Sequence, residues 1–356
     1  MKIFYAAFKY EYGNVERGFS FEHYNFYDTL VKMNERENNV IYFPVDQMLK
    51  QYGRDKMNSR LLEVVFKEKP DLCFFFLVGE EIKKETIKDI TEKSKVLTLN
   101  WFADDHWKFG TFSRHWAPCF SWVVTTDSLA VKKYQKTGYK NVIHSQWACN
   151  HFLCKPLNLP KIYDVTFLGQ PHGNRKKIVE KIKKSGINIE CWGWGWSQGC
   201  VSEDKMVEIF SQSKINLGLT NSSFEGPLKS LFRIFFKKSA DKKIKIDNPF
   251  HWLGNLKMIL NKQKNQLKGR NYDVPGCGSF LLTQDADDLK NRYQDGKEIV
   301  IFKDNEDLIK KINYFLKNDK ERESIAKAGY ERTIKEHTYE KRFNEIFNIM
   351  GLNKNG

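Results

Sequence analysis

Short apolar runs alternate with polar, helix-like segments through the first 150 residues. The runs are rich in β-branched and aromatic side chains, and several are almost continuously apolar. Such strands are typical of a parallel sheet that is buried on both faces. Six strands are expected, at Lys2–Phe8, Val40–Pro44, Asp71–Leu77, Val96–Phe102, Trp122–Thr126 and Val142–Trp147. Helical patterns lie between them, at Phe21–Asn34, Met57–Lys67 and Leu129–Gln135. This alternation predicts a doubly wound, Rossmann-like α/β domain.

A second alternating unit follows a proline-containing segment that has no periodicity. Its expected strands are Asp164–Gly169, Asn188–Trp192, Ile215–Leu219, Phe280–Thr283 and Ile299–Phe302. Its expected helices are Arg175–Lys184, Glu203–Ser211 with Ser202 as N-cap, Glu306–Leu316, Glu321–Lys335 and Tyr339–Met350. The predicted division is a first domain at 1–155, a linker at 156–162, a second domain at 163–337, and a C-terminal helix and tail at 338–356.

A basic insertion at residues 222–266 interrupts the second domain. Two basic amphipathic pieces, LKSLFRIFFKK and FHWLGNLKMILNK, flank the polar stretch SADKKIKIDNP. On a helix, four apolar side chains of the first piece share one face: Leu228, Leu231, Phe232 and Phe235. The segment from Glu225 to Arg270 holds twelve Lys or Arg and three Asp or Glu, a net charge of +9. Two interpretations stand: a helix packed on the domain, or an interfacial anchor that draws the protein to anionic membrane.

Composition narrows the class of protein. With 41% hydrophobic and 14% aromatic residues, the 356-residue chain can bury two cores. No apolar run reaches the roughly 20 residues of a membrane helix, and the N-terminus reads as a strand. The seven cysteines show no zinc-site spacing, which indicates buried reduced thiols in a cytoplasmic protein. The net charge of +15 indicates acidic partners.

The stretch KGRNYDVPGCGSFLLTQ carries the strongest chemical signal in the sequence. Lys268 and Arg270 can neutralise phosphate, and Asp273 can accept hydrogen bonds from a ribose diol. Gly276 and Gly278 would let the backbone come close to a ligand. Glu298, just before the next strand, is either a second ligand-binding acid or a surface acid.

Two further turns of the second domain are candidates for the same site. Gly169 and Arg175 lie in the turn and helix start after the domain's first strand, where ligands bind in open α/β sheets. Arg175 and the helix N-terminus would offset negative charge on a leaving diphosphate. After the second strand comes CWGWGWSQG, where Trp194 is expected to stack on a base or a sugar while at least one neighbouring tryptophan fills the core.

The first domain offers two clusters of reactive groups. The long loop after its first strand contains Glu11, Gly13, Arg17 and Glu22, which we assign to the acceptor side, with Glu22 as a catalytic candidate. After the fourth strand, Asp104, Asp105 and His106 would supply a general base or orient a hydroxyl. Solvated acids capping a loop are the alternative. This D-D-H sequence lacks the D-x-D spacing of a metal-dependent site, so neither a metal nor a cofactor is expected.

In this order, the motifs resemble the CgeB-like glycosyltransferases over nearly the full length. The shared segments include YGNVERGFSFE, NWFADDHW, DVTFLGQPHGNR, GWGWSQG and KGRNYDVPGCGSFLLT. The resemblance implies the GT-B fold, two Rossmann-like domains facing a cleft with a C-terminal helix crossing back to the first domain. It also implies a ribose contact for the acid at Asp273, where the family usually has glutamate. Related retaining enzymes have a second glutamate eight residues earlier, and that position here is Asn265, so the stereochemistry stays open.

The leading hypothesis is a glycosyltransferase that moves a sugar from a nucleoside-diphosphate sugar to a hydroxyl of a glycan, a lipid-linked glycan or a protein. Bacterial surface polysaccharide or glycoconjugate synthesis is the expected setting. A nucleotide-sugar epimerase on the same fold is one alternative. A basic nucleic-acid-binding protein is another, but the positive charge is concentrated in one insertion rather than along a recognition element, so no nucleic acid is expected.

Overall fold

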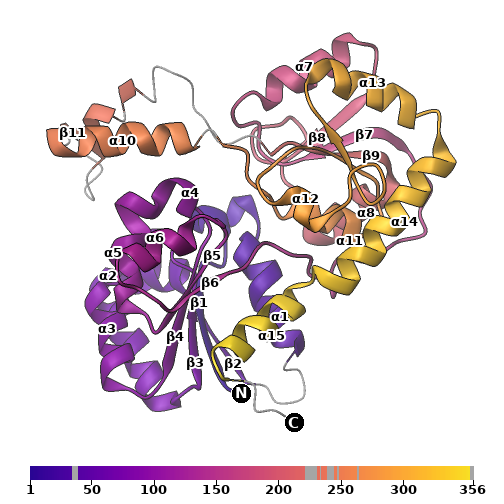
Figure 1. Cartoon of the computed structure of the whole chain (residues 1–356). Coiled ribbons are helices and arrows are strands. Elements are labelled where there is room, and N and C mark those ends of the chain that lie inside the picture. The colour runs from indigo at the N-terminus through magenta and orange to yellow at the C-terminus, as the bar shows by residue number, and fades with distance from the viewer. Residues whose placement is uncertain are drawn as a thin grey trace. The chain divides into compact units, whose positions relative to one another are not determined.

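The computed structural model describes residues 1–33, 39–220, 231–232, 234–238, 244–246, 248–262 and 264–352. The chain divides into two compact units. The first contains Met1–Asp105, Phe112–Phe152 and Glu336–Gly356, and the second contains His106–Thr111 and Leu153–Lys335. Each unit has its own parallel sheet with helices on it (Figure 1), which confirms the predicted pair of Rossmann-like α/β domains.

The first unit is built on a six-stranded sheet in the order β2-β1-β3-β4-β5-β6, with every pair parallel. The strands are β1 Ile3–Ala7, β2 Val40–Pro44, β3 Leu72–Phe75, β4 Leu97–Phe102, β5 Trp122–Thr125 and β6 Val142–His144. All six predicted strands are confirmed, most with slightly shorter ends. β1 lies inside the sheet and all five of its residues are buried, which explains its continuous apolar sequence.

The described helices of the first unit include counterparts of all three helical patterns predicted from the sequence. They are α1 Asp28–Met33, α2 Val45–Glu68, α3 Lys84–Lys93, α5 Arg114–Trp116 and α6 Ala130–Lys136, with α4 Asp105–Lys108 crossing the unit boundary. Shorter turns are η1 Glu11–Gly13, η2 Val15–Arg17, η3 His23–Tyr27, η4 Phe109–Ser113 and η5 Ala117–Cys119. α2 was predicted only from Met57, because a kink at Gly53 interrupts its periodicity.

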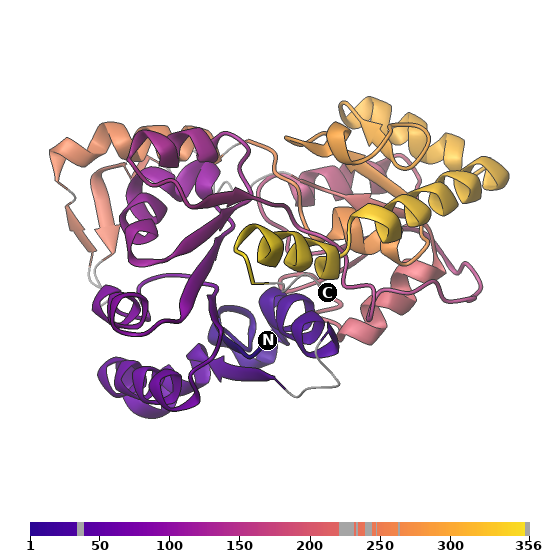
Figure 2. The same cartoon turned by 60° about the horizontal axis from the view of Figure 1, so that its bottom comes forward.

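The last helix of the chain, α15 Tyr339–Ile349, belongs to the first unit. Its Tyr339, Phe343, Ile346 and Phe347 are buried in the same hydrophobic cluster as the strand residues of the first sheet. Figures 1 and 2 show α15, in yellow, beside the indigo helix α1. This arrangement confirms the expected return of the C-terminal helix to the first domain.

The second unit contains a five-stranded parallel sheet in the order β13-β12-β9-β7-β8. Its strands are β7 Tyr163–Leu168, β8 Ile189–Trp192, β9 Ser213–Gly218, β12 Leu281–Gln284 and β13 Val300–Phe302. Its helices are α7 Arg175–Lys184, α8 Glu203–Gln212, α11 Arg270–Gly276, α12 Leu289–Arg292, α13 Asn305–Phe315 and α14 Asp319–Glu336. All five predicted strands are confirmed. Ser202 caps α8 as predicted, accepting a hydrogen bond from the Lys205 amide at 3.3 Å.

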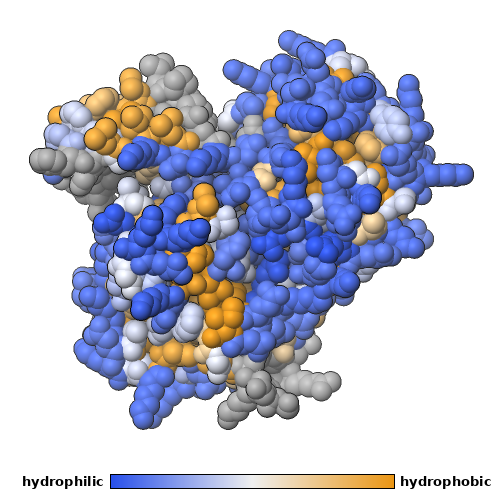
Figure 3. Space-filling view, viewed as in Figure 1, coloured by the Kyte–Doolittle hydropathy of each residue, from blue (hydrophilic) through white to orange (hydrophobic). Residues whose placement is uncertain are grey.

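The insertion differs from its predicted structure. A basic helix was expected through LKSLFRIFFKK. Leu231, Phe232, Ile234 and Phe235 are helical, but Phe236–Lys238 form strand β10, which pairs antiparallel with β11, Ile244–Ile246. This pairing across the hairpin overrides the local helical pattern. Leu228 lies outside the described residues. The second amphipathic piece is a helix as predicted, α10 Pro249–Lys262, and Figure 3 shows hydrophobic surface gathered over this part of the chain.

The cysteines and the helices match the remaining predictions from composition. Six of the seven cysteines are buried thiols, and Cys200 is exposed. Within the described ranges, none of the helices combines the length and the apolar character needed to cross a bilayer.

Candidate functional site

In the second unit, the turns that follow β7 and β8 pack backbone against backbone. The Gly169 amide donates to the Trp192 carbonyl at 2.8 Å, and the Trp196 indole Nε1–H donates to the Gly169 carbonyl at 2.6 Å. A Cβ on Gly193 would lie 2.8 Å from the carbonyl carbon and oxygen of Gly169. Glycine is therefore required at position 193 by close packing of two turns.

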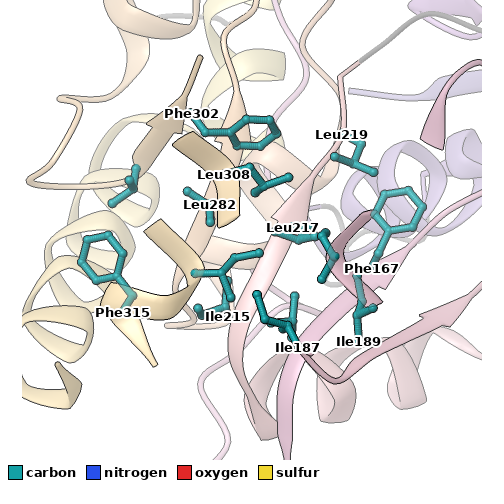
Figure 4. Packing of buried hydrophobic residues seen from close by; sticks show 14 of the residues in the cluster. Phe167, Ile187, Ile189, Ile215, Leu217, Leu219, Leu282, Phe302, Leu308 and Phe315 are labelled. Atoms are coloured by element: carbon teal, nitrogen blue, oxygen red, sulfur yellow. The ribbon is translucent and has the colours of Figure 1, made fainter. Parts of the chain in front are cut away.

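Two arginines meet on one aromatic ring at the end of β7. The guanidinium carbons of Arg175 and Arg270 lie 5.6 and 5.2 Å from the ring centroid of Phe167. Figure 4 shows Phe167 beside Leu219 in the hydrophobic cluster. Arg175 is only 6% exposed and donates to the carbonyls of Gln170 and Leu219, both at 2.8 Å. The structure thus brings together two predicted donor-binding residues.

The electrostatics of this pair favour an anion. Burial, followed by the positive charge of Arg270, lowers the pKa of Arg175 to about 9. Two like charges held on one ring repel each other, and a bound anion would relieve that repulsion. Arginine forks match phosphate oxygens in geometry as well as in charge. The arrangement is therefore suited to a diphosphate.

A chain of buried polar groups fixes the segment that carries Arg270. The Lys268 amide donates to Asn271 Oδ1 at 2.9 Å, and Asn271 Nδ2 donates to Thr283 Oγ1 at 3.0 Å. Thr283 Oγ1 donates in turn to the Gly218 carbonyl at 3.0 Å. α11 is thereby tied to β12 and β9. The sequence analysis missed Asn271 and Thr283, although a threonine inside an apolar strand was a visible signal.

Asp273 lies deeper than its predicted role suggested. It is 3% exposed, and burial, followed by the neighbouring Cys154 thiol, raises its pKa well above the usual range despite the opposing effect of Arg270. Burial therefore favours the neutral form of this carboxyl. Cys154 Sγ and the Asp273 carboxyl lie within 4.8 Å of each other.

The glycines near α11 serve the fold more directly than expected. Gly276 is buried inside α11. Gly278 has φ +64°, and a Cβ there would lie 3.1 Å from Cγ of Pro156 in the predicted linker. The close approach is to protein and not to the expected ligand. Similarly, the Glu298 carboxylate accepts a hydrogen bond from the Gln294 amide at 2.8 Å, which gives this acid a local turn-capping role.

The three tryptophans after β8 have different environments. Trp192 is 6% exposed and packs edge-on against Tyr163, with ring centroids 5.3 Å apart. Trp196 packs against Phe167 at 6.3 Å. Trp194 is 42% exposed. Of the three, Trp194 offers the largest exposed fraction to a ligand, while Trp192 fills the core.

The first unit gathers acids around the loop that follows β1. Burial, followed by the negative charge of Glu11 and then of Asp104, raises the pKa of Glu22 to about 7. Burial also raises the pKa of Glu11, while Arg17 opposes that shift. These four predicted residues therefore share one electrostatic environment. A carboxyl with a pKa of about 7 is suited to accept or give a proton near neutral pH.

An exposed tyrosine and a half-buried aspartate shape the same loop. Tyr12, which the sequence analysis missed, is 63% exposed, has a left-handed backbone (φ 53°) and lies under the Arg17 guanidinium at 4.9 Å. Asp46 accepts hydrogen bonds from the amides of Lys9 at 2.7 Å and Tyr10 at 3.2 Å. Gly13 packs near Asp46, with its ideal Cβ position 3.4 Å from Asp46 Cβ.

Asp105 does not belong with these acids. It is fully buried, and its Oδ2 accepts a hydrogen bond from the Tyr134 hydroxyl at 2.8 Å. Burial raises its pKa to about 6. The structure therefore corrects the grouping of Asp104 and Asp105, because adjacent residues at the start of a helix turn in different directions. His106, 9% exposed, is also largely buried.

Comparison with known proteins agrees with this geometry. Residues 175–348 match the sequence model of a family described as "Glycosyl transferase-like". The chain is 20% identical over 288 residues to spore protein CgeB of Bacillus subtilis (strain 168), covering 80% of this chain and 84% of that protein. The chain is similar to CgeB over most of its length. This confirms the resemblance identified from the sequence motifs.

Solved structures establish the architecture of this CgeB-like protein. Sucrose-phosphate synthase from Thermosynechococcus elongatus has a TM-score of 0.64 and 9% identity, covering 98% of this chain and 99% of that chain. Anabaena HepE in complex with UDP-glucose has a TM-score of 0.59 and 8% identity, covering 99% of each chain. The fold is GT-B, and family and fold together support a glycosyltransferase.

Proposed function

We propose that this protein transfers a sugar from a nucleoside-diphosphate sugar to a hydroxyl of a glycan, a lipid-linked glycan or a protein. The setting we propose is bacterial surface polysaccharide or glycoconjugate synthesis on the cytoplasmic side. The observation that carries the proposal is the pair Arg175 and Arg270 on the face of Phe167. The UDP-glucose complex of HepE, a protein of the same fold, supports a donor of this class.

In this proposal the second unit holds the donor. Arg175 and Arg270 offset the charge of the diphosphate, most strongly as the sugar–oxygen bond breaks and the leaving nucleoside diphosphate gains charge. Lys268 adds positive charge near the start of α11, and Gly169 leaves room for the Arg270 guanidinium. Trp194 stacks on the base or the sugar. Because two arginines already balance the diphosphate, we propose that transfer needs no metal.

Asp273 is the proposed ribose contact. A carboxyl accepts hydrogen bonds from a diol best when it is ionised, but burial keeps Asp273 neutral in the protein alone. A bound nucleotide sugar would bring ribose hydroxyls that donate hydrogen bonds to the Asp273 carboxyl. These hydrogen bonds and the positive charge of Arg270 both favour the ionised form of Asp273. Glu298 is the weaker candidate for binding the nucleotide sugar, because its carboxylate already caps a turn.

The first unit would present the acceptor. In an inverting reaction Glu22 takes the acceptor proton, the acceptor oxygen bonds to the anomeric carbon, and the bond to the diphosphate breaks. Glu11 and Asp104 raise the pKa of Glu22 and so make it a stronger base. In a retaining reaction the leaving phosphate takes the proton and no protein base is needed. A carboxyl with a pKa of about 7 favours the inverting course.

The donor site is tested by nucleotide binding to the wild-type protein and to Arg270→Ala. A thermal-shift screen of nucleoside diphosphates and their sugars identifies the base, because a tightly bound ligand raises the melting temperature. We expect Arg270→Ala to weaken diphosphate binding at least about tenfold. Lys176→Ala, which removes an exposed charge from the adjacent helix, is the matched control. Equal affinity in Arg270→Ala and wild type would exclude the arginine pair as the diphosphate site.

An epimerase on the same fold remains the second candidate function. It would convert its nucleotide sugar without an acceptor, whereas a transferase releases nucleoside diphosphate faster when the acceptor is present. Product analysis with and without a glycan extract therefore separates the two.

A further inference from the structure

The insertion holds an unusual share of the exposed apolar side chains. Of the seventeen large hydrophobic side chains that are exposed among the described residues, seven lie between positions 231 and 260. They come from three short segments: Leu231 and Phe232, then Ile244 and Ile246 of β11, then Leu253, Leu256 and Leu260 of α10. Ile246 is 70% exposed and Leu253 is 74% exposed. We name these seven residues the insertion surface.

α10 has a packed face and, next to it, an exposed apolar stripe. On the packed face, Asn255 donates to the Ile234 carbonyl at 3.0 Å, and the ring of Trp252 meets Phe235 with centroids 4.9 Å apart. Ile259, on the same side, is 8% exposed. The exposed leucines follow a spacing of three and four residues, which places them on one stripe beside the packed face, about 100° around the helix from it.

The apolar stripe lies inside the most basic part of the chain. Glu225 to Arg270 carries a net charge of +9. Lys257 and Lys264 are exposed, and Lys257 follows Leu256 directly in α10. Apolar residues on one face with lysines around them are the pattern of a helix that lies in the plane of a membrane surface. Lysine stems can also cover apolar surface while their charges reach outward.

We propose that the insertion surface docks this enzyme on an anionic lipid bilayer, with the leucine stripe of α10 among the lipids and the lysines at the headgroups. A second copy of the chain fits less well, because a symmetric contact through this surface would place the two +9 segments against each other. An anionic bilayer complements both the charge and the apolar stripe. This goes beyond the sugar-transfer proposal and does not depend on it.

The test is sedimentation of the full chain with vesicles, in the absence of nucleotide. One set of vesicles is phosphatidylcholine, and in the other set part of the lipid is replaced by phosphatidylglycerol. We expect the wild type to sediment with the anionic vesicles and to be released by salt. Leu253→Ser/Leu256→Ser/Leu260→Ser should lose at least about tenfold in partitioning, because the apolar stripe is removed.

A matched triple variant controls for the loss of exposed apolar side chains in general. Leu129, Leu157 and Ile162 are 58%, 40% and 58% exposed, close to the 74%, 40% and 56% of the α10 leucines. Replacing all three with serine should leave vesicle binding unchanged. Circular dichroism and nucleotide thermal shifts on both variants check that folding and donor binding are intact.

Two kinds of result would overturn the proposal. One is a wild-type protein that stays in the supernatant with both kinds of vesicle, or an α10 triple variant that sediments as well as wild type. The other is a wild-type dimer in light scattering that becomes a monomer in the α10 variant without any lipid, which would make the surface a contact between copies. Because no nucleotide is present, these outcomes leave the sugar-transfer proposal unaffected.

Discussion

A Cβ at Gly169 would lie 2.4 Å from Nη2 of Arg270, so this arginine occupies the space that a side chain would need. Gly169 has φ +147°, which L side chains rarely adopt. The residue that follows β7 therefore helps determine where the charge of α11 lies.

Gly169→Ala is expected to displace the Arg270 guanidinium and to weaken nucleoside-diphosphate binding at least about tenfold. Titration calorimetry measures the affinity. Gly186→Ala is the control, since Gly186 also has a positive φ (+80°) but nothing lies within 4 Å of its ideal Cβ position. It should lose stability and keep affinity. Equal losses of affinity in both variants would mean that backbone strain, and not Arg270, is responsible.

Asn271→Ala should lower the free energy of unfolding by about 1–3 kcal/mol, because it leaves buried polar groups unpaired. The Lys268 amide loses its acceptor, and Thr283 loses a donor. Urea denaturation measures the change. Asn291→Ala, which removes an exposed hydrogen bond to Asp288, should change stability far less. We also expect a weaker thermal shift from nucleoside diphosphate in Asn271→Ala, because the start of α11 loses its anchor.

The raised pKa of Glu22 gives a pH signature in stability. Its folded pKa is about 7 against an ordinary 4.5, so the folded state holds a proton that the unfolded state releases. Stability should therefore fall as pH rises from about 4.5 to about 7. Glu22→Gln removes this penalty, and its melting temperature should exceed that of wild type at pH 8 but not at pH 4. The same difference at both pH values would show that Glu22 is not the titrating group.

Transfer activity should distinguish the role of Glu22 from that of Asp105. We expect Glu22→Gln to lower the transfer rate at least about a hundredfold if Glu22 is the base. Asp105→Asn should cost less than about tenfold, since an amide oxygen can still accept the Tyr134 hydroxyl and the residue is remote from solvent. Transfer assays across pH 6–9 provide the measurement. A larger loss in Asp105→Asn than in Glu22→Gln would reverse this assignment.

The strands could be read from sequence because burial on both faces leaves a nearly continuous apolar signature, as in β3, Leu72–Phe75. Strand β10, Phe236–Lys238, could not be predicted in this way, because its pairing with Ile244–Ile246 determines its structure. In the same way, nothing local distinguishes Asp104 from Asp105. Tyr134, 29 residues from Asp105 along the chain, holds that second carboxylate through a hydrogen bond. The basic residues of the proposed donor site could be picked out from the sequence, whereas their meeting on Phe167 depends on packing between distant segments.

The place of α15 in the first unit has a consequence for how the protein is made. The first hydrophobic cluster is completed by Tyr339, Phe343, Ile346 and Phe347, which leave the ribosome after the whole of Leu153–Lys335. Domains generally fold in the order in which they are synthesised. Here the first unit keeps an exposed apolar surface until α15 has been synthesised, so the second unit can complete its folding before the first.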